Sequence, residues 1–238
     1  MEIILFIVII VGASTLQTST GFGFSIIATP FLLLLFNVTD AIQINLILSL
    51  VISGVLIWNI HSDIDMDLLK RLIIGSVFGM PVGIVIFMVI DLVKLKFVIS
   101  LIILLLTVLL ILSFRMNQTN RKDTFFGGLS GSLTTSIGMP GPPLLLYFSG
   151  TNIQKEKLRG TTLAFYLFIY SISLLLQLYF SGTNKTVWIS SGLAIPFVFA
   201  GLYWGQLLFK RIDQRTFRFV TYGILLFTGL FLLFDNLK

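Results

Sequence analysis

The chain of 238 residues contains no cysteine, a single histidine and few charged residues, which make up 11% of the total. Without cysteine it cannot form a disulfide framework, a thiolate metal site, an iron–sulfur cluster or a cysteine nucleophile. With only His61, histidine-based zinc sites and Ser-His-Asp catalysis lack the residues they need. The sequence also lacks the Gly-x4-Gly-Lys-Ser/Thr loop that binds ATP phosphates. We therefore expect no enzyme activity, no cofactor and no bound metal.

The low charge is accompanied by high hydrophobicity, with 56% hydrophobic residues and a mean hydropathy of +1.02. An ordinary soluble domain is about 25% charged, so this chain has too little charge to cover a surface that faces water. The net charge of +6 would favour a nucleic-acid partner in a soluble protein, but here the basic residues lie in short loops between apolar runs. That pattern is typical of membrane topology. We expect an all-α polytopic membrane protein that contacts the lipid bilayer and no nucleic acid.

Every charged residue lies outside eight apolar stretches of the sequence. A helix needs about 20 apolar residues to cross a bilayer core about 30 Å thick, and six of the stretches fit one crossing each. The eight stretches are 3–36, 41–60, 72–90, 97–114, 124–150, 160–181, 186–209 and 219–234.

The stretches 3–36 and 124–150 do not fit a single crossing. The first is too long for one helix and is interrupted by two glycines within residues 20–23. The second is interrupted at residues 138–143, where three prolines prevent a continuous helix. Non-helical backbone at membrane depth is tolerated only where it is buried in protein or lines an aqueous cavity. We therefore predict two broken hairpins, either re-entrant or made of two short crossings, that point into the protein.

The distribution of basic residues supports two limbs in each broken stretch. With two limbs, four loops share one side of the membrane and hold twelve of the sixteen Lys and Arg residues. If each broken stretch crossed the membrane only once, the Lys and Arg residues would be divided nine against seven between the two sides, which is no bias. Since basic loops stay in the cytoplasm, we expect a multi-pass protein of the bacterial plasma (inner) membrane with both termini on the extracytoplasmic side. The four basic loops are 61–71, 115–123, 151–159 and 210–218.

The two broken stretches are related by an internal repeat. Each half of the chain would contain a broken hairpin, which returns to its starting side, and three crossings. Because three is an odd number, the second half would begin on the opposite side of the membrane, so the two halves would have opposite orientations. Inverted repeats of this kind are common in secondary transporters, whose substrate site lies near the midplane. We predict one integral membrane domain, 1–238, with repeats at about 1–118 and 119–238. A shift of 117 superposes Thr18, Ser19 and Gly21 on Thr135, Ser136 and Gly138, and a shift of 122 superposes Gly79, Gly83 and Asp91 on Gly201, Gly205 and Asp213.

Both breaks offer groups that can bind an anion. A helix N-terminus carries unpaired N–H groups and about half a positive charge, so it can bind an anion without Lys or Arg. Hydroxyls add donors, and glycine lets the backbone approach a ligand closely. The alternative is that these small residues only allow close packing of helices. The candidate residues are Gln17, Thr18, Ser19, Thr20, Gly21, Gly23 and Ser25 at the first break, Thr134, Thr135, Ser136, Gly138 and Gly141 at the second, and Asn45 and Thr161, which either flank the cavity or form hydrogen bonds between helices.

These residues resemble a known family. Residues 20–25, followed by Pro30, are similar to the first-half motif of the sulfite exporter TauE/SafE family, also called the toluene sulfonate uptake permease family. Residues 127–131 and 138–143, then Tyr147 and 159–161, are similar to its second-half motif. The resemblance covers essentially the whole chain. It implies a bacterial inner-membrane permease for sulfur-containing or related organic anions such as sulfite or sulfonates. Its implied substrate region is Thr20, Gly21, Gly23, Gly138, Gly141 and Pro142.

The leading hypothesis is thus a secondary transporter for a small anion, bound where the two breaks meet. The alternative is a membrane scaffold or assembly protein that transports nothing. An intramembrane enzyme is disfavoured because the apolar stretches contain no Lys or carboxylate and only His61 is available outside them. The absence of a carboxylate there also disfavours a proton relay. The direction of transport, the coupling ion and the oligomeric state stay open.

Overall fold

The computed structural model describes residues 2–90, 117–149, 151, 153–211 and single positions within 94–108 and 223–230. The apolar stretches 97–114 and 219–234 therefore lie outside the described residues, apart from those single positions. The described ranges are helical and contain no strand, which confirms the all-α class. In chain order the helices are α1 (Glu2–Thr20), α2 (Phe24–Leu35), α3 (Val38–Ile60), η1 (His61–Asp63), α4 (Met66–Val89), α6 (Asn120–Ile137), α7 (Gly141–Ser149), α8 (Lys155–Ser181) and α9 (Lys185–Arg211).

Five of these helices are long and apolar enough to cross a membrane, which confirms a polytopic membrane protein. The five spans are Ile3–Thr20, Val38–Trp58, Met66–Val89, Lys155–Ser181 and Lys185–Phe209. At 1.5 Å per residue, the 19 residues of α1 reach about 28 Å, whereas the 12 of α2 and the nine of α7 reach about 18 Å and 13 Å. Neither short helix can cross a bilayer alone.

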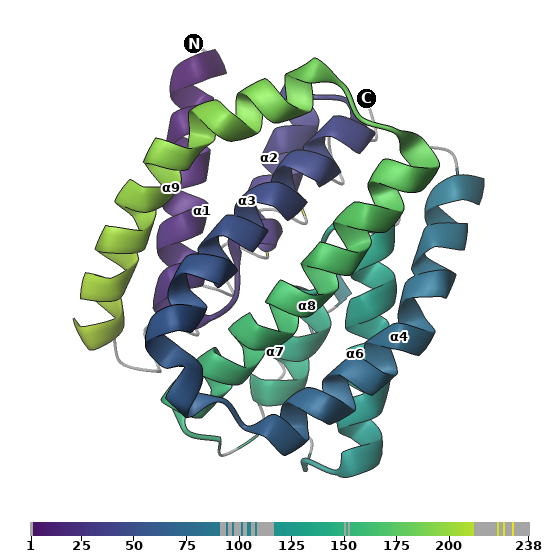
Figure 1. The fold of residues 1–238 in the computed structure, drawn as a ribbon, viewed down its shortest axis with the longest axis vertical. Helices are drawn as coiled ribbons and strands as arrows, with labels where there is room; N and C mark the ends of the chain where they lie inside the picture. The colour runs from purple at the N-terminus through teal and green to yellow at the C-terminus, as the bar shows by residue number, and fades with distance from the viewer. Residues whose placement is uncertain are drawn as a thin grey trace.

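The chain reverses direction at both predicted breaks. Near the start of α1, the Phe6 ring lies 5.8 Å from the ring of Phe36, the residue after α2, measured between centroids. In the same way Phe126 in the first half of α6 stacks on Tyr147 in α7, with centroids 4.6 Å apart. Each long helix and the short helix that follows it therefore form a hairpin with one long and one short limb, as Figure 1 shows.

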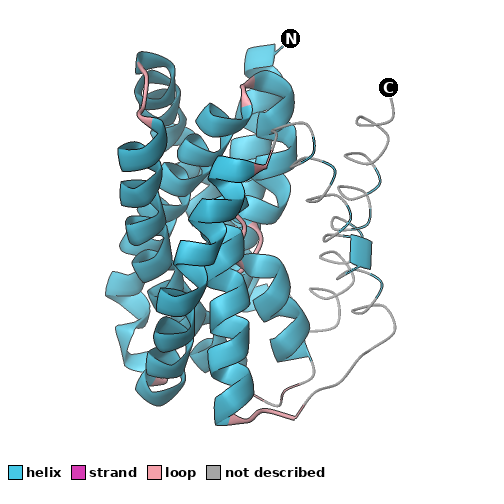
Figure 2. Ribbon diagram, turned by 90° about the vertical axis from the view of Figure 1, so that its right-hand side faces the viewer, coloured by secondary structure: helices cyan, strands magenta, loops and turns pink. Residues whose placement is uncertain are grey.

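Helices α3 and α8 lie side by side in the centre of the bundle, between the pair α1 and α9 and the pair α4 and α6 (Figure 1). The helix axes run alongside one another in the view of Figure 2. The connections α3–α4 and α7–α8 and the start of α6 gather at one end of the bundle, and the N-terminus and the α8–α9 connection lie at the other (Figure 1). Three of the four basic loops therefore share one end.

Glycines hold the two outer pairs of helices together. A Cβ atom on Gly83 of α4 would collide with Ser132 and Thr135 of α6. A Cβ atom on Gly205 of α9 would collide, at 2.5–2.6 Å, with Thr15 and Thr18 of α1. These glycines let the helix backbones approach to a distance that any larger side chain would prevent. Gly83 and Gly205 are equivalent positions of the internal repeat, related by the shift of 122. The residues that they contact are also equivalent, because the shift of 117 relates Thr15 to Ser132 and Thr18 to Thr135.

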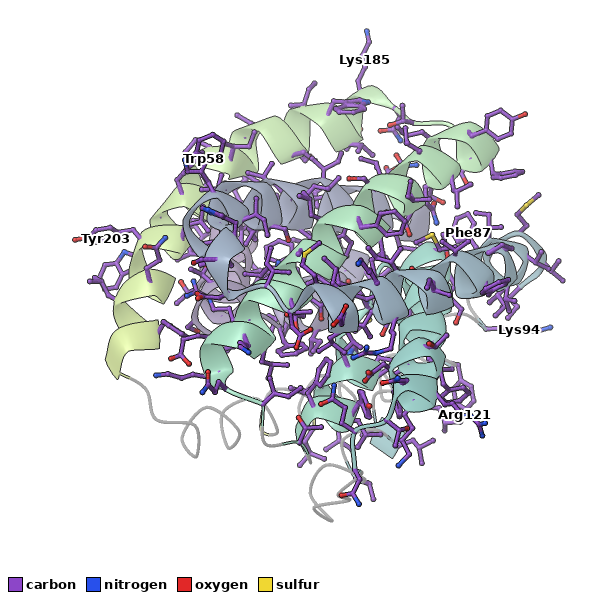
Figure 3. The ribbon with its side chains drawn as sticks, turned by 60° about the horizontal axis from the view of Figure 1, so that its bottom comes forward. Trp58, Phe87, Lys94, Arg121, Lys185 and Tyr203 are labelled. Atoms are coloured by element: carbon purple, nitrogen blue, oxygen red, sulfur yellow. The ribbon has the colours of Figure 1, made fainter. Side chains whose placement is uncertain are left out.

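The outer surface of the bundle is apolar and aromatic, as a lipid-facing surface should be. Trp58 is 84% exposed and Tyr203 is also exposed, and Figure 3 shows both side chains pointing outward. Lys185, the first residue of α9, also points outward. The interior of the bundle, in contrast, contains buried polar side chains, among them Gln17, Asn45 and Gln177.

Candidate functional site

The first break is a tight turn made by two glycines. α1 ends at Thr20, and Gly21 adopts a left-handed conformation with φ 79° while its N–H donates a 2.8 Å hydrogen bond to the carbonyl of Gln17. Gly23 has φ 114° and precedes Phe24, the first residue of α2. Positive φ values are readily adopted only by glycine, so these two residues allow the chain to turn here.

The second break repeats this geometry at the equivalent positions. α6 ends at Ile137, and Gly138 is left-handed with φ 73° and donates a 2.8 Å hydrogen bond to the carbonyl of Thr134. The bond from Gly138 is that of an αL helix end, and the N–H of Met139 also donates to the carbonyl of Leu133 at 3.2 Å. The predicted interruption is therefore present in both hairpins, at the expected residues.

The N-terminal ends of the short helices differ in the donors that they offer. In α2 the first turn has no side-chain cap, so the N–H groups of Phe24, Ser25 and Ile26 are not satisfied by a capping residue. In α7 the second and third residues are Pro142 and Pro143, which have no N–H. Among the first three residues of α7, Gly141 alone therefore has a backbone N–H group. Most of the backbone donors at the two helix ends belong to α2.

The two N-terminal ends meet inside the bundle. A side-chain carbon of Ile26 lies 3.1 Å from the position that a Cβ on Gly141 would occupy, and the hydroxyl of Tyr166 lies 3.4 Å from the same point. One turn along α8, the hydroxyl of Tyr170 donates to Oγ of Ser25 at 3.5 Å. All these residues are buried. The result is an enclosed cluster in which α2, α7 and α8 bring backbone amides and hydroxyls together.

Three buried amide side chains connect the ends of α1 and α6 to neighbouring helices. Asn45 of α3 donates to the carbonyl of Gly138 at 2.7 Å, and Gln177 of α8 donates to the carbonyl of Thr135 at 2.9 Å. Gln17 of α1 donates to Oγ of Ser53 at 3.4 Å. All three amides are buried, and their side-chain oxygens have no hydrogen-bond partner in the described part of the protein. The amides are fixed by their nitrogen atoms and present free acceptors.

Most of the predicted hydroxyls are occupied within their own helices. Such bonds to the carbonyl three or four residues earlier leave the hydroxyl no proton to donate to a ligand. Thr135 makes this bond and also donates to the carbonyl of Met80 in α4. The other hydroxyls that donate in this way are those of Ser19, Thr20, Thr134 and Ser136.

Two more candidates lie away from the meeting point of the short helices. Thr18 is buried against Gly205 of α9, and its hydroxyl has no partner in the described residues. Thr161 accepts a 2.9 Å hydrogen bond from the N–H of Asp65, so it fastens the α3–α4 connection to α8. Of the candidates, the structure brings Gly23, Ser25, Asn45, Gly141 and Pro142 to the two short-helix ends and the breaks beside them, while Gly21 and Gly138 form the turns.

Sequence reasoning missed Tyr166 and Tyr170, the two residues that link the short helices to α8. Their spacing of four places both on one face of a helix, and this signal was available in the sequence. It also missed a network at the start of α6, where Arg71 contacts the buried carboxylate of Asp123 at 2.7 Å and Tyr147 donates to the same carboxylate at 2.6 Å. α6 begins at Asn120, four residues before the apolar stretch 124–150, so Asp123 lies inside the helix rather than in a loop.

No group of three or more His, Cys, Asp or Glu residues in the described ranges could hold a metal ion. A family model described as sulfite exporter TauE/SafE matches residues 5–232, nearly the whole chain. Neither the curated proteins nor the solved structures gave a match.

Proposed function

The chain belongs to the sulfite exporter TauE/SafE family, a family of membrane transporters, and we propose that it is a secondary permease for one small anion. The substrate class is sulfite, a sulfonate or a related organic anion. The observation that carries this proposal is the meeting of the α2 and α7 N-terminal ends in a buried cluster of amides and hydroxyls.

The chemistry of the cluster suits an anion with several oxygen atoms. The first turn of α2 supplies N–H groups that lack a capping side chain, and a helix N-terminus favours negative charge. Ser25, Tyr166 and Tyr170 add hydroxyls that can rotate toward a ligand oxygen. A sulfite or sulfonate group presents three oxygens, so it can accept hydrogen bonds from several of these donors at once.

We assign separate roles to the candidate residues. Gly23 and Gly141 let the backbone reach the anion, and Ser25 donates to it. Asn45 holds the end of α6 in place through its hydrogen bond to Gly138. The hydroxyls that are bonded within α1 and α6 stabilise the ends of those helices instead of contacting the anion.

We also propose that the two halves, about 1–118 and 119–238, are inverted repeats. The equivalent turns at Gly21 and Gly138 support this, as do the equivalent contacts of Gly83 and Gly205. An inverted repeat would allow the site to open alternately to the two sides of the membrane. The end with the basic loops would face the cytoplasm, and both termini would face outward.

Transport by purified protein in proteoliposomes tests the proposal. Vesicles loaded with labelled sulfite, sulfoacetate, methanesulfonate or a short carboxylate should exchange at least one sulfur-containing anion faster than empty liposomes. A Gly138→Leu protein that is folded by circular dichroism is the matched control. Equal rates for protein and empty liposomes with every anion would contradict the proposal and favour the scaffold hypothesis.

A further inference from the structure

The face of α8 that points into the protein is polar along nearly the whole helix. Six positions spaced by three or four residues share this face, and all six side chains are buried. The first and last are eighteen residues apart, about 27 Å at 1.5 Å per residue, which is close to the ~30 Å thickness of a bilayer core. The six side chains of this polar face are Arg159, Thr162, Tyr166, Tyr170, Ser173 and Gln177.

Most of the side chains on this polar face have a polar atom without a hydrogen-bond partner among the described residues. Five of the six side chains have a buried nitrogen or oxygen atom with no partner in the described residues, and the sixth, Tyr170, makes a long bond of 3.5 Å to Ser25. An unpartnered buried polar atom costs about 1–3 kcal/mol. Five on one helix face would be a large penalty if packing were their purpose, so these groups are suited to a polar guest that comes and goes. The five atoms are Nε of Arg159, Oγ1 of Thr162, the hydroxyl of Tyr166, Oγ of Ser173 and Oε1 of Gln177.

Helix α3 presents a matching face. It packs against α8 in the centre of the bundle. Asn45, Ser49 and Ser53 are spaced by four residues and are all buried. Oδ1 of Asn45 and Oγ of Ser49 have no partner in the described ranges. The two central helices thus both carry polar side chains into the interior, and the short-helix ends with Ser25 and Gly141 lie beside the middle of the α8 face.

Arg159 occupies one end of the polar face and is a buried cation. Its side chain is 7% exposed, and its guanidinium carbon lies 4.3 Å from the centroid of the Phe209 ring. Asp63 is nearby and packs on Gly160, but it forms no ion pair with Arg159 in the part of the chain that is described. A buried charge is costly unless it is paired, and a cation–π contact recovers only about 2 kcal/mol.

Arg159 also lies against the first break. Its Cα atom is 3.1 Å from the point where a Cβ on Gly21 would lie. Seven residues further along α8, Tyr166 contacts Gly141, so about 10 Å of helix separates the cation from the meeting point of the short helices. Under the shift of 117 the equivalent residue is Ile42, which lies beside Gly138. The guanidinium is therefore present at only one of the two breaks.

We infer that the buried polar face of α8, together with that of α3, is the path along which the anion crosses the membrane, and that Arg159 selects for negative charge at the end of this path beside Gly21. This inference rests on the proposed transport function. In the state described here the path is closed, because all nine side chains on the two faces are buried. Separation of α3 and α8 would open it in turn toward each side.

Labelling of single cysteines tests the path, and the absence of native cysteine means that no background target exists. Thr162→Cys and Ser173→Cys place a thiol on the polar face with little change in volume. Leu175→Cys is the control, because Leu175 is on the outer surface of the same helix and is 62% exposed. In membrane vesicles an anionic methanethiosulfonate reagent should label both polar-face variants at least tenfold faster than Leu175→Cys. Methanesulfonate should slow that labelling.

Equal labelling rates on the two faces would overturn the path, whatever the flux measurements show. Faster labelling that methanesulfonate leaves unchanged would overturn the assignment of the path to an anion. Absence of flux for every anion in the wild-type protein would contradict the proposed function separately, because labelling does not depend on flux.

Substitution of Arg159 tests the selection of charge. Arg159→Gln should raise the KM for anion flux at least tenfold, and Arg159→Lys should recover part of the loss because the charge is kept. Lys155→Gln is the matched control, since Lys155 also lies over the Phe209 ring, at 5.0 Å, but is about half exposed. A purified Arg159→Gln protein should also lose the rise in Tm that methanesulfonate gives the wild-type protein. An unchanged KM and an unchanged rise in Tm would overturn the role of Arg159.

Discussion

The side-chain amide of Asn45 donates a 2.7 Å hydrogen bond to the carbonyl oxygen of Gly138, so α3 directly holds the last turn of α6. Asn45→Leu keeps a similar volume but leaves this carbonyl without a donor. We expect a loss of about 1–3 kcal/mol in the free energy of unfolding, seen as a lower Tm in detergent, together with reduced anion flux. Gln206→Leu, at an exposed position of α9, should change neither. A normal Tm for Asn45→Leu would contradict the role of this bond.

The turn at Gly138 should tolerate no side chain. Alanine in a left-handed conformation costs about 1–2 kcal/mol, and at Gly138 the added Cβ would also lie 2.8 Å from Nδ2 of Asn45. Gly182 also has a positive φ, 69°, but an extended ψ of −168°, and it has no atom within 4 Å of its Cβ position. Gly182→Ala therefore measures the cost of a glycine-only backbone conformation without any clash. We expect both variants to have a lower Tm and only Gly138→Ala to lose flux; equal flux in the two proteins would show that the turn does not shape the site.

The hydroxyl of Tyr166 should matter for the anion and not for folding. It has no partner in the described residues, so Tyr166→Phe removes an unpaired polar atom and should leave Tm unchanged or raise it. If the hydroxyl donates to the anion, the same variant should raise KM by about threefold to tenfold, which corresponds to one hydrogen bond of about 0.5–1.5 kcal/mol. Tyr179→Phe, at a residue that is 83% exposed, is the control. A lower Tm with an unchanged KM would assign the hydroxyl to structure.

Close packing of α9 on α1 should depend on Gly205. Its Cβ position is 2.5 Å from Cβ of Thr18 and 2.6 Å from the carbonyl oxygen of Thr15, and backbone atoms cannot give way cheaply. Gly205→Ala should lower the free energy of unfolding by about 1–3 kcal/mol through overpacking. Gly192→Ala, elsewhere in α9 with no atom within 4 Å, should raise it by up to about 1 kcal/mol because alanine favours the helix. The two Tm values, measured under the same conditions, should move in opposite directions.

The sequence predicted the helix breaks well and the roles of the residues near them less well. The turns at Gly21 and Gly138 were expected because glycines and prolines interrupt apolar stretches that are too long for one crossing. The prediction that the surrounding hydroxyls face a ligand stays untested, and their geometry argues for a narrower set. Ser19 and Ser136, for example, donate to carbonyls of their own helices. A hydroxyl near a helix end can bond locally or face a ligand, and the residue type does not distinguish the two.

The amino-acid sequence by itself determined the membrane class, the interrupted helices and the grouping of the basic loops, because the cost of placing charge or unpaired backbone in lipid acts on each segment separately. Only the tertiary structure decided which polar atoms are left without partners. Whether the hydroxyl of Tyr166, the amide of Gln177 or the guanidinium of Arg159 is satisfied depends on what neighbouring helices place opposite it. Hydrogen bonds and charge pairing are made between segments distant in sequence, and helix packing brings those segments together.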